Sequence, residues 1–72
     1  MKRVLCTGAG GPAGINFTMS LRVSPEKMFL VGTDSNELYL NLTITDSKYL
    51  VPRAKESMYI DRLNEIISKE KI

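Results

Sequence analysis

The sequence predicts an α/β fold in which parallel strands alternate with helices. Short continuous apolar runs alternate along the chain with segments of helical periodicity, and a glycine-rich turn separates the first run from the first helix. The expected order is strand, helix, strand, helix, strand, helix, in a single domain over residues 1–72. Such alternation is typical of a parallel sheet with right-handed crossovers.

The first strand is expected from Arg3 to Thr7, since its central residues Val4, Leu5 and Cys6 are consecutive and apolar. A continuous apolar run indicates a strand that is covered on both faces, as in a parallel sheet. Gly8 ends the run.

The first helix is expected to begin at Pro12, with Gly11 as its N-cap, because proline suits the first helical position. It should end at Ser24-Pro25, since a proline disfavours helix in the residue before it. The apolar residues predicted to pack on the sheet are Ala13, Phe17 and Leu21, joined by Ile15 and Met19.

The middle of the chain predicts two strands and a short helix. The second strand is expected over Lys27 to Thr33, and Asp34 to Asn36 forms a loop that starts a helix over Glu37 to Leu42. After a weakly patterned segment from Thr43 to Ser47, a third strand runs from Lys48 to Val51 and stops at Pro52. The predicted buried residues here are Met28, Phe29, Leu30 and Val31 in the strand, and Leu38, Tyr39 and Leu42 in the helix.

The last helix is expected from Met58 to Lys71, with Ser57 as its cap. Its apolar stripe combines two rows, Tyr59-Leu63-Ile66 and Ile60-Leu63-Ile67. The polar side predicted to face solvent holds Asp61, Arg62, Glu65, Lys69 and Glu70.

The six elements predict half of a doubly wound, Rossmann-like sheet with strand order 3-2-1. This order leaves the first strand as an open edge. Because the chain reaches Ile72 within helical pattern and without a stop signal, we expect a partial domain that is truncated at its C-terminus. The expected partners are the remaining domains of a parent protein, or a second copy that pairs through the open edge. One hypothesis is therefore a non-enzymatic half-domain that associates to complete its sheet.

The glycine-rich turn predicts a site for an anionic group or a substrate. Gly8 allows a sharp turn, Gly10 and Gly11 allow close approach to the backbone, and Gly14 allows the helix to pack closely on the strand. Free amides at a helix start favour an anion. Turn geometry alone is the alternative explanation for all four glycines.

The Thr-Gly-x-x-Gly-x-x-Gly spacing that starts at Thr7 is similar to that of extended short-chain dehydrogenases and sugar epimerases. Asp34 lies twenty residues after Gly14, where a ribose-binding acid is expected. NAD(P) binding is therefore one hypothesis. The simpler interpretation of Asp34 is an acid that helps to cap the following helix, and Asn36 has the same alternative.

A second resemblance covers nearly the whole chain. It rests on five segments: Val4–Asn16, Leu30–Asn36, Tyr49–Ala54, Tyr59–Asp61 and Leu63–Ile67. In order and spacing these segments resemble the N-terminal, pre-ATP-grasp domain of carbamoyl-phosphate-synthase-like ATP-grasp proteins. The resemblance implies a nucleotide-type, Rossmann-like domain that helps to form the floor of the acceptor-substrate site.

The resemblance also implies the reaction of the parent protein. ATP activates a carboxylate as an acyl phosphate, and an amine or similar nucleophile then attacks it. The ATP-binding lysines and magnesium-binding carboxylates of that family lie in later domains, so we expect no catalytic residue and no metal site in this chain. The resemblance thus predicts a ligase of which this part is inactive alone.

Two further residues have candidate roles. Arg53 follows the third strand at its carboxyl end, where ligands gather in open α/β sheets, so it is a candidate for binding an anionic group. An exposed surface arginine is the alternative. Cys6 is predicted to be a small buried apolar residue.

Several classes are disfavoured by composition. The chain has no histidine, which removes histidine-dependent nucleophilic catalysis and histidine zinc sites. A single cysteine fits a reducing, cytoplasmic compartment. The net charge of +2 comes from dispersed residues rather than a basic patch, so nucleic-acid binding is not expected. No apolar stretch approaches membrane-spanning length.

Overall fold

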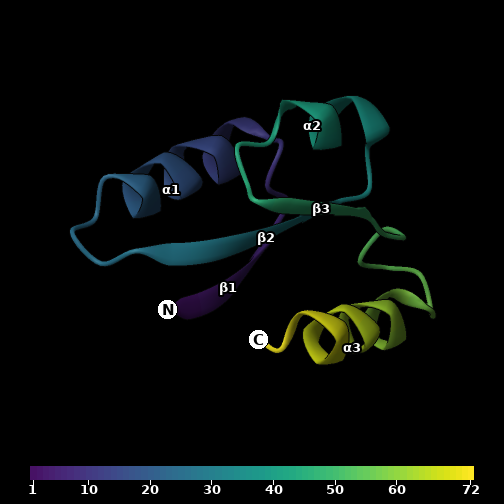
Figure 1. Ribbon diagram of the computed structural model, residues 1–72. Coiled ribbons are helices and arrows are strands. Elements are labelled where there is room, and N and C mark those ends of the chain that lie inside the picture. Colours follow the sequence, from purple (N-terminus) through teal and green to yellow (C-terminus); the bar gives the residue numbers. More distant parts are fainter.

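The protein is an α/β unit with one three-stranded parallel sheet and helices on both of its faces (Figure 1). The computed structural model describes all residues from Met1 to Ile72. The elements follow in the order β1 (Lys2–Thr7), α1 (Pro12–Arg22), β2 (Met28–Asp34), α2 (Glu37–Leu42), β3 (Ser47–Leu50) and α3 (Tyr59–Glu70). The α/β class and the parallel sheet that the alternation predicted are confirmed.

The strands lie in the order β1-β2-β3, which read from the opposite edge is 3-2-1. β2 is central, with Thr7 paired to Thr33 and Asp34 paired to Leu50 in register. Because the strands are parallel, their carboxyl ends share one edge of the sheet. The outer edge of β1 has no neighbouring strand.

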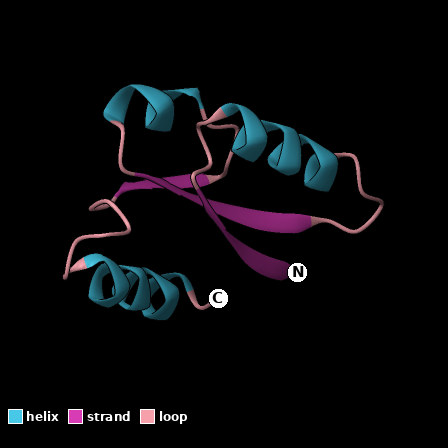
Figure 2. Cartoon of the chain, turned by 180° about the vertical axis from the view of Figure 1, so that it is seen from behind, coloured by secondary structure: helices cyan, strands magenta, loops and turns pink.

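Helices α1 and α2 cover one face of the sheet and α3 covers the other, as both views show (Figure 2). Each face has its own small core. On the α1 side Cys6, Ala9 and Leu30 are buried together, and on the α3 side Val31, Val51 and Ile66 are buried together. The burial of Cys6 confirms its prediction as an apolar core residue, and burial raises the pKa of its thiol.

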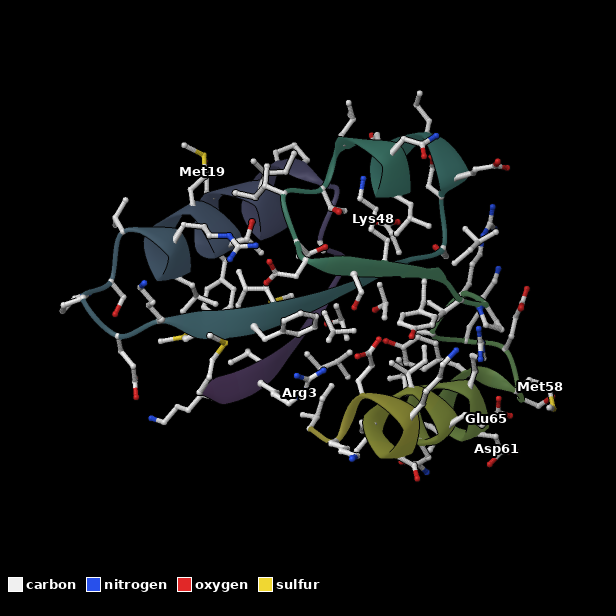
Figure 3. The ribbon with its side chains drawn as sticks, in the orientation of Figure 1. Arg3, Met19, Lys48, Met58, Asp61 and Glu65 are labelled. Atoms are coloured by element: carbon white, nitrogen blue, oxygen red, sulfur yellow. The ribbon has the colours of Figure 1, made fainter.

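Helix α1 packs only in part through the predicted residues: Leu21 packs against the core as expected. The buried residue of the helix is Thr18, whereas Phe17 and Met19 are more than half exposed, and Figure 3 shows Met19 pointing away from the sheet. A Cβ on Gly14 would lie 2.0 Å from the carbonyl oxygen of Gly8. The missing side chain therefore lets the helix approach the loop closely, and this contact turns the bulkier residues toward solvent.

Fewer apolar residues are buried in β2 and α2 than the sequence predicted. In β2 only Leu30 and Val31 of the four expected apolar residues are fully buried. In α2 the predicted core residues Leu38, Tyr39 and Leu42 are exposed, because this six-residue helix sits at the edge of a three-stranded sheet. A small domain has too little interior to cover every apolar side chain.

Helix α3 confirms one predicted row and contradicts only Ile60 of the other. Tyr59, Leu63 and Ile66 pack on the sheet, whereas Ile60 is 61% exposed. Ser57 is not the cap: Met58 occupies that position and no side chain caps the helix.

The helix also has a stop that its pattern did not reveal. Lys71 adopts a left-handed conformation (φ 55°), and the amide of Ile72 donates to the carbonyl of Ile67 at 3.1 Å. This is the bonding pattern of a Schellman motif.

Glu70 was expected on the solvated side of α3, and this prediction is wrong. Its carboxylate accepts hydrogen bonds from Arg3, Ser47 and Tyr49, so it ties α3 to both edge strands. Figure 3 shows Arg3 on the side of β1 that faces α3. The Arg3 guanidinium also lies 4.2 Å from the ring centre of Phe29, a cation–π distance.

Candidate functional site at the carboxyl edge of the sheet

The glycine turn between β1 and α1 is held by bonds within the protein. The amide of Ala9 donates to the carbonyl of Thr33 at 3.0 Å, that of Gly10 to Oδ2 of Asp34 at 3.1 Å, and that of Gly11 to the carbonyl of Gly8 at 3.2 Å. Gly8 has φ +58°, a left-handed conformation that favours glycine. Three consecutive amides of the turn are therefore occupied.

Two of the glycines are required by close packing. A Cβ on Gly10 would lie 1.8 Å from the carbonyl oxygen of Tyr39 in α2, and a Cβ on Gly14 would meet the Gly8 carbonyl. At Gly11 the nearest atom would lie at 3.7 Å, which is ordinary contact. Close packing at positions 10 and 14 and the left-handed backbone at position 8 thus give sufficient reasons for glycine, and an anion-binding role for the turn stays a prediction.

Asp34 joins the turn to the start of α2. Its Oδ1 accepts the amide of Asn36 at 3.0 Å while its Oδ2 accepts that of Gly10, and the residue is 8% exposed. Asn36 in turn caps α2 by accepting the amide of Tyr39 at 3.0 Å. Both residues therefore do what the simpler interpretation predicted.

The free amides of the turn lie at the start of α1. Ala13 and Gly14 occupy the first turn of the helix, where the carbonyls four residues earlier lie outside it, and neither amide forms such a bond. The N-cap, Gly11, provides no side chain to satisfy them.

A pocket of about 240 Å³ opens at the carboxyl ends of all three strands. This is the edge where ligands bind in open α/β sheets. The residues that line it are Thr7, Gly8, Thr33, Asp34, Ser35, Val51, Pro52, Ala54 and Tyr59. Of the predicted site residues, the pocket brings together Gly8 and Asp34.

The other predicted site residues lie around the pocket rather than in its wall. Arg53 is exposed and stands between two lining residues, Pro52 and Ala54, without an ion-pair partner. Gly10, Gly11 and Gly14 lie on the turn beside it, outside the lining.

Four hydroxyls in the lining were not singled out in the sequence: Thr7, Thr33, Ser35 and Tyr59. None of them forms a hydrogen bond within the protein. Thr33 is 1% exposed and its Oγ1 is buried without a partner. A signal that could have found Thr7 and Thr33 is their shared place at the carboxyl ends of adjacent strands.

No group of three or more histidine, cysteine, aspartate or glutamate side chains lies close enough together to hold a metal ion. The helices are all too short or too polar to cross a membrane. Comparisons of the chain with models of protein families, with curated proteins and with solved structures gave no match.

Proposed function

We propose that this chain is the N-terminal, substrate-side part of an ATP-dependent, carboxylate-activating ligase of the ATP-grasp type. In this proposal the unit is half of a doubly wound, Rossmann-like sheet, and the carboxyl edge of the sheet faces the acceptor substrate. ATP and magnesium are bound by other domains of the parent protein, and the chain alone is inactive.

One observation carries the proposal. The five segments that resemble pre-ATP-grasp domains are scattered along the chain, yet all nine residues that line the pocket belong to four of them. Thr7 and Gly8 come from the first segment, Thr33 to Ser35 from the second, and Tyr59 from the fourth. The third supplies Val51, Pro52 and Ala54. A parallel sheet brings its strand ends to one edge in any case, and the support for the proposal is that the resembling segments supply the entire lining of the cavity at that edge.

An NAD(P)-binding role has less support from the geometry. A dinucleotide cradle needs turn amides that point to the pyrophosphate. Here the amides of Ala9, Gly10 and Gly11 are bonded within the protein, which leaves those of Ala13 and Gly14 free at the helix start, and Asp34 already accepts two amides. A volume of about 240 Å³ is also below the usual range for ligand pockets, roughly 300–1,000 Å³.

The free edge of β1 supports the proposed partners. A strand with unpaired backbone groups is a template for a further strand, supplied by the parent protein or by a second copy. Light scattering of the isolated chain distinguishes the two: a dimer indicates self-pairing, and a folded monomer leaves the parent protein as the source of the strand.

The coding sequence around this chain gives the first test of the proposal. We expect ATP-grasp residues, an ATP-binding lysine and magnesium-binding carboxylates, in the same reading frame beyond Ile72 or in a neighbouring one. The protein that contains both parts should release ADP from ATP in the presence of an activatable carboxylate. Absence of such residues from both reading frames overturns the proposal.

A further inference from the structure

The hydroxyl groups of the chain fall into two sets. In one set are side chains that bond to other groups of the protein, such as Thr18, Thr45 and Tyr49. The hydroxyls without a protein partner belong to seven residues: Thr7, Thr33, Ser35, Tyr39, Ser57, Tyr59 and Ser68. Four of these seven line the pocket at the carboxyl edge.

The remaining three unpartnered hydroxyls are on exposed residues, as are Thr7 and Ser35 in the pocket, and water satisfies them in the free protein. Thr33 is different because its Oγ1 is buried and unbonded. A buried hydroxyl without a partner destabilises a fold, and such groups are rare in native proteins. A ligand in the pocket would supply the partner that the fold does not.

The charge of the lining restricts the ligand. No lysine or arginine lines the pocket, and its one charged residue is the carboxylate Asp34. An anion placed there would be repelled by Asp34, and the nearest unpaired cation in sequence, Arg53, lies beside the lining rather than in it. Hydroxyls both donate and accept hydrogen bonds, so they match a neutral partner that does the same.

We propose that the Thr7-Thr33-Ser35-Tyr59 pocket binds a small, uncharged, hydroxyl-bearing group, such as a sugar ring or a short polyol. The volume of about 240 Å³ suits one such group rather than a dinucleotide. This inference rests on the proposed function only in taking the pocket as the substrate side. It then states that the substrate of the parent protein carries a polyhydroxylated part.

Binding is measured on the 72-residue chain alone, by titrating labelled protein with ribose and following amide and methyl chemical shifts. A group of this size should bind with a Kd on the order of 1–10 mM. Saturating shifts should be confined to Thr7, Gly8, Thr33, Ser35 and Tyr59. Sodium phosphate and sodium acetate serve as anionic probes and should not compete.

Two variants test the assignment, and a third is the matched control. Thr33→Val and Ser35→Ala should each weaken ribose binding roughly fivefold, since each removes one hydrogen bond. Thr33→Val should also raise the melting temperature, because it removes a buried unpartnered hydroxyl. Ser68→Ala removes an unpartnered hydroxyl far along α3 and should change neither property.

Several results would overturn the inference: no saturable shifts with ribose, shifts outside the pocket, ribose binding by both Thr33→Val and Ser35→Ala that equals binding by the unchanged protein, or displacement of ribose by phosphate. Because Ser35 is exposed, its variant stays informative even if Thr33→Val does not fold. The assay uses neither ATP nor other domains, so its failure is distinct from failure of the ligase proposal.

Discussion

The backbone amide of Gly10 donates a 3.1 Å hydrogen bond to Oδ2 of Asp34, across a sequence separation of 24 residues. This bond fastens the turn after β1 to the end of β2. With the bond from Oδ1 to Asn36 and the bond from the Val51 amide to the carbonyl of Asp34, it makes Asp34 the residue that connects all three strand ends. These bonds connect the segments that form the carboxyl edge beside the pocket.

Asp34→Ala should lower the free energy of unfolding by about 2–3 kcal/mol, because two amides lose a charged acceptor and that of Gly10 is left buried without a partner. Urea denaturation measures the change. Asp61→Ala, at an exposed position in the first turn of α3, is the control and should cost less than about 1 kcal/mol. Equal effects of the two variants would contradict the bracing role of Asp34.

Gly10→Ala should destabilise the protein by more than about 2 kcal/mol, since its Cβ would lie 1.8 Å from the Tyr39 carbonyl oxygen. Gly11→Ala is the matched control in the same turn, where the nearest atom lies at 3.7 Å. Its cost should stay within about 1 kcal/mol, the usual loss for alanine at an N-cap. Thermal unfolding of the two variants measures the difference. Similar melting temperatures would contradict a close contact between position 10 and the Tyr39 carbonyl.

Thr33→Val should raise the free energy of unfolding by about 1 kcal/mol, as it replaces a buried, unpartnered hydroxyl by a methyl group. Thr45→Val makes the same change at a buried threonine whose Oγ1 bonds to Thr43 and to the carbonyl of Ser47. It should lower the free energy by about 1 kcal/mol. The opposite signs, read from chemical denaturation, distinguish a hydroxyl kept for binding from one kept for stability.

The contacts of Glu70 predict a loss of stability in acid. Its hydrogen bonds from Tyr49, Ser47 and Arg3 hold the pKa of the Glu70 carboxyl below its ordinary value. The stabilising contribution is therefore complete above the ordinary carboxyl pKa and is lost as pH falls through the lowered one. In Glu70→Gln, the urea midpoint of unfolding should fall less steeply as pH decreases through the lowered Glu70 pKa. The same fall in Glu70→Gln and in the unchanged protein would exclude the Glu70 contacts as the cause of the acid instability.

The same pair predicts a loss of stability in alkali. The hydrogen bond to Glu70 raises the pKa of the Tyr49 phenol, so its contribution is complete below the ordinary tyrosine pKa and is lost as pH rises through the raised one. Tyr49→Phe should remove this alkaline loss. Tyr39→Phe, at an exposed tyrosine whose hydroxyl has no partner, is the control and should leave the profile unchanged.

Local pattern was sufficient to predict the elements but not their buried faces. The apolar runs, Gly11-Pro12 and Ser24-Pro25 give the strands and both ends of α1 to within a few residues. The face of α1 depends on a contact between Gly14 and the carbonyl of Gly8, which periodicity does not encode. Glu70 looked like a solvated acid because its partners Arg3 and Tyr49 are distant in sequence.

The candidate site was predictable only in part, for a similar reason. Glycine spacing and position directed attention to Gly8 and Asp34, and both lie at the pocket. The hydroxyl of Thr33 had only the weaker signal of its place at a strand end, and that of Tyr59 had none, since a hydroxyl at a helix start has many ordinary roles. Only the meeting of three strand ends with the start of α3 shows that they share one cavity.

The most direct test of the proposed substrate-side role uses the full protein in which, on that proposal, this chain is joined to ATP-grasp domains. ADP release is measured with ATP and a panel of carboxylates, with and without hydroxyl groups, for the unchanged protein and for Thr33→Val and Ser35→Ala. The account predicts that the KM for the hydroxylated substrate rises in both variants while the KM for ATP stays constant. A rise in the KM for ATP with no change for the other substrate would contradict it.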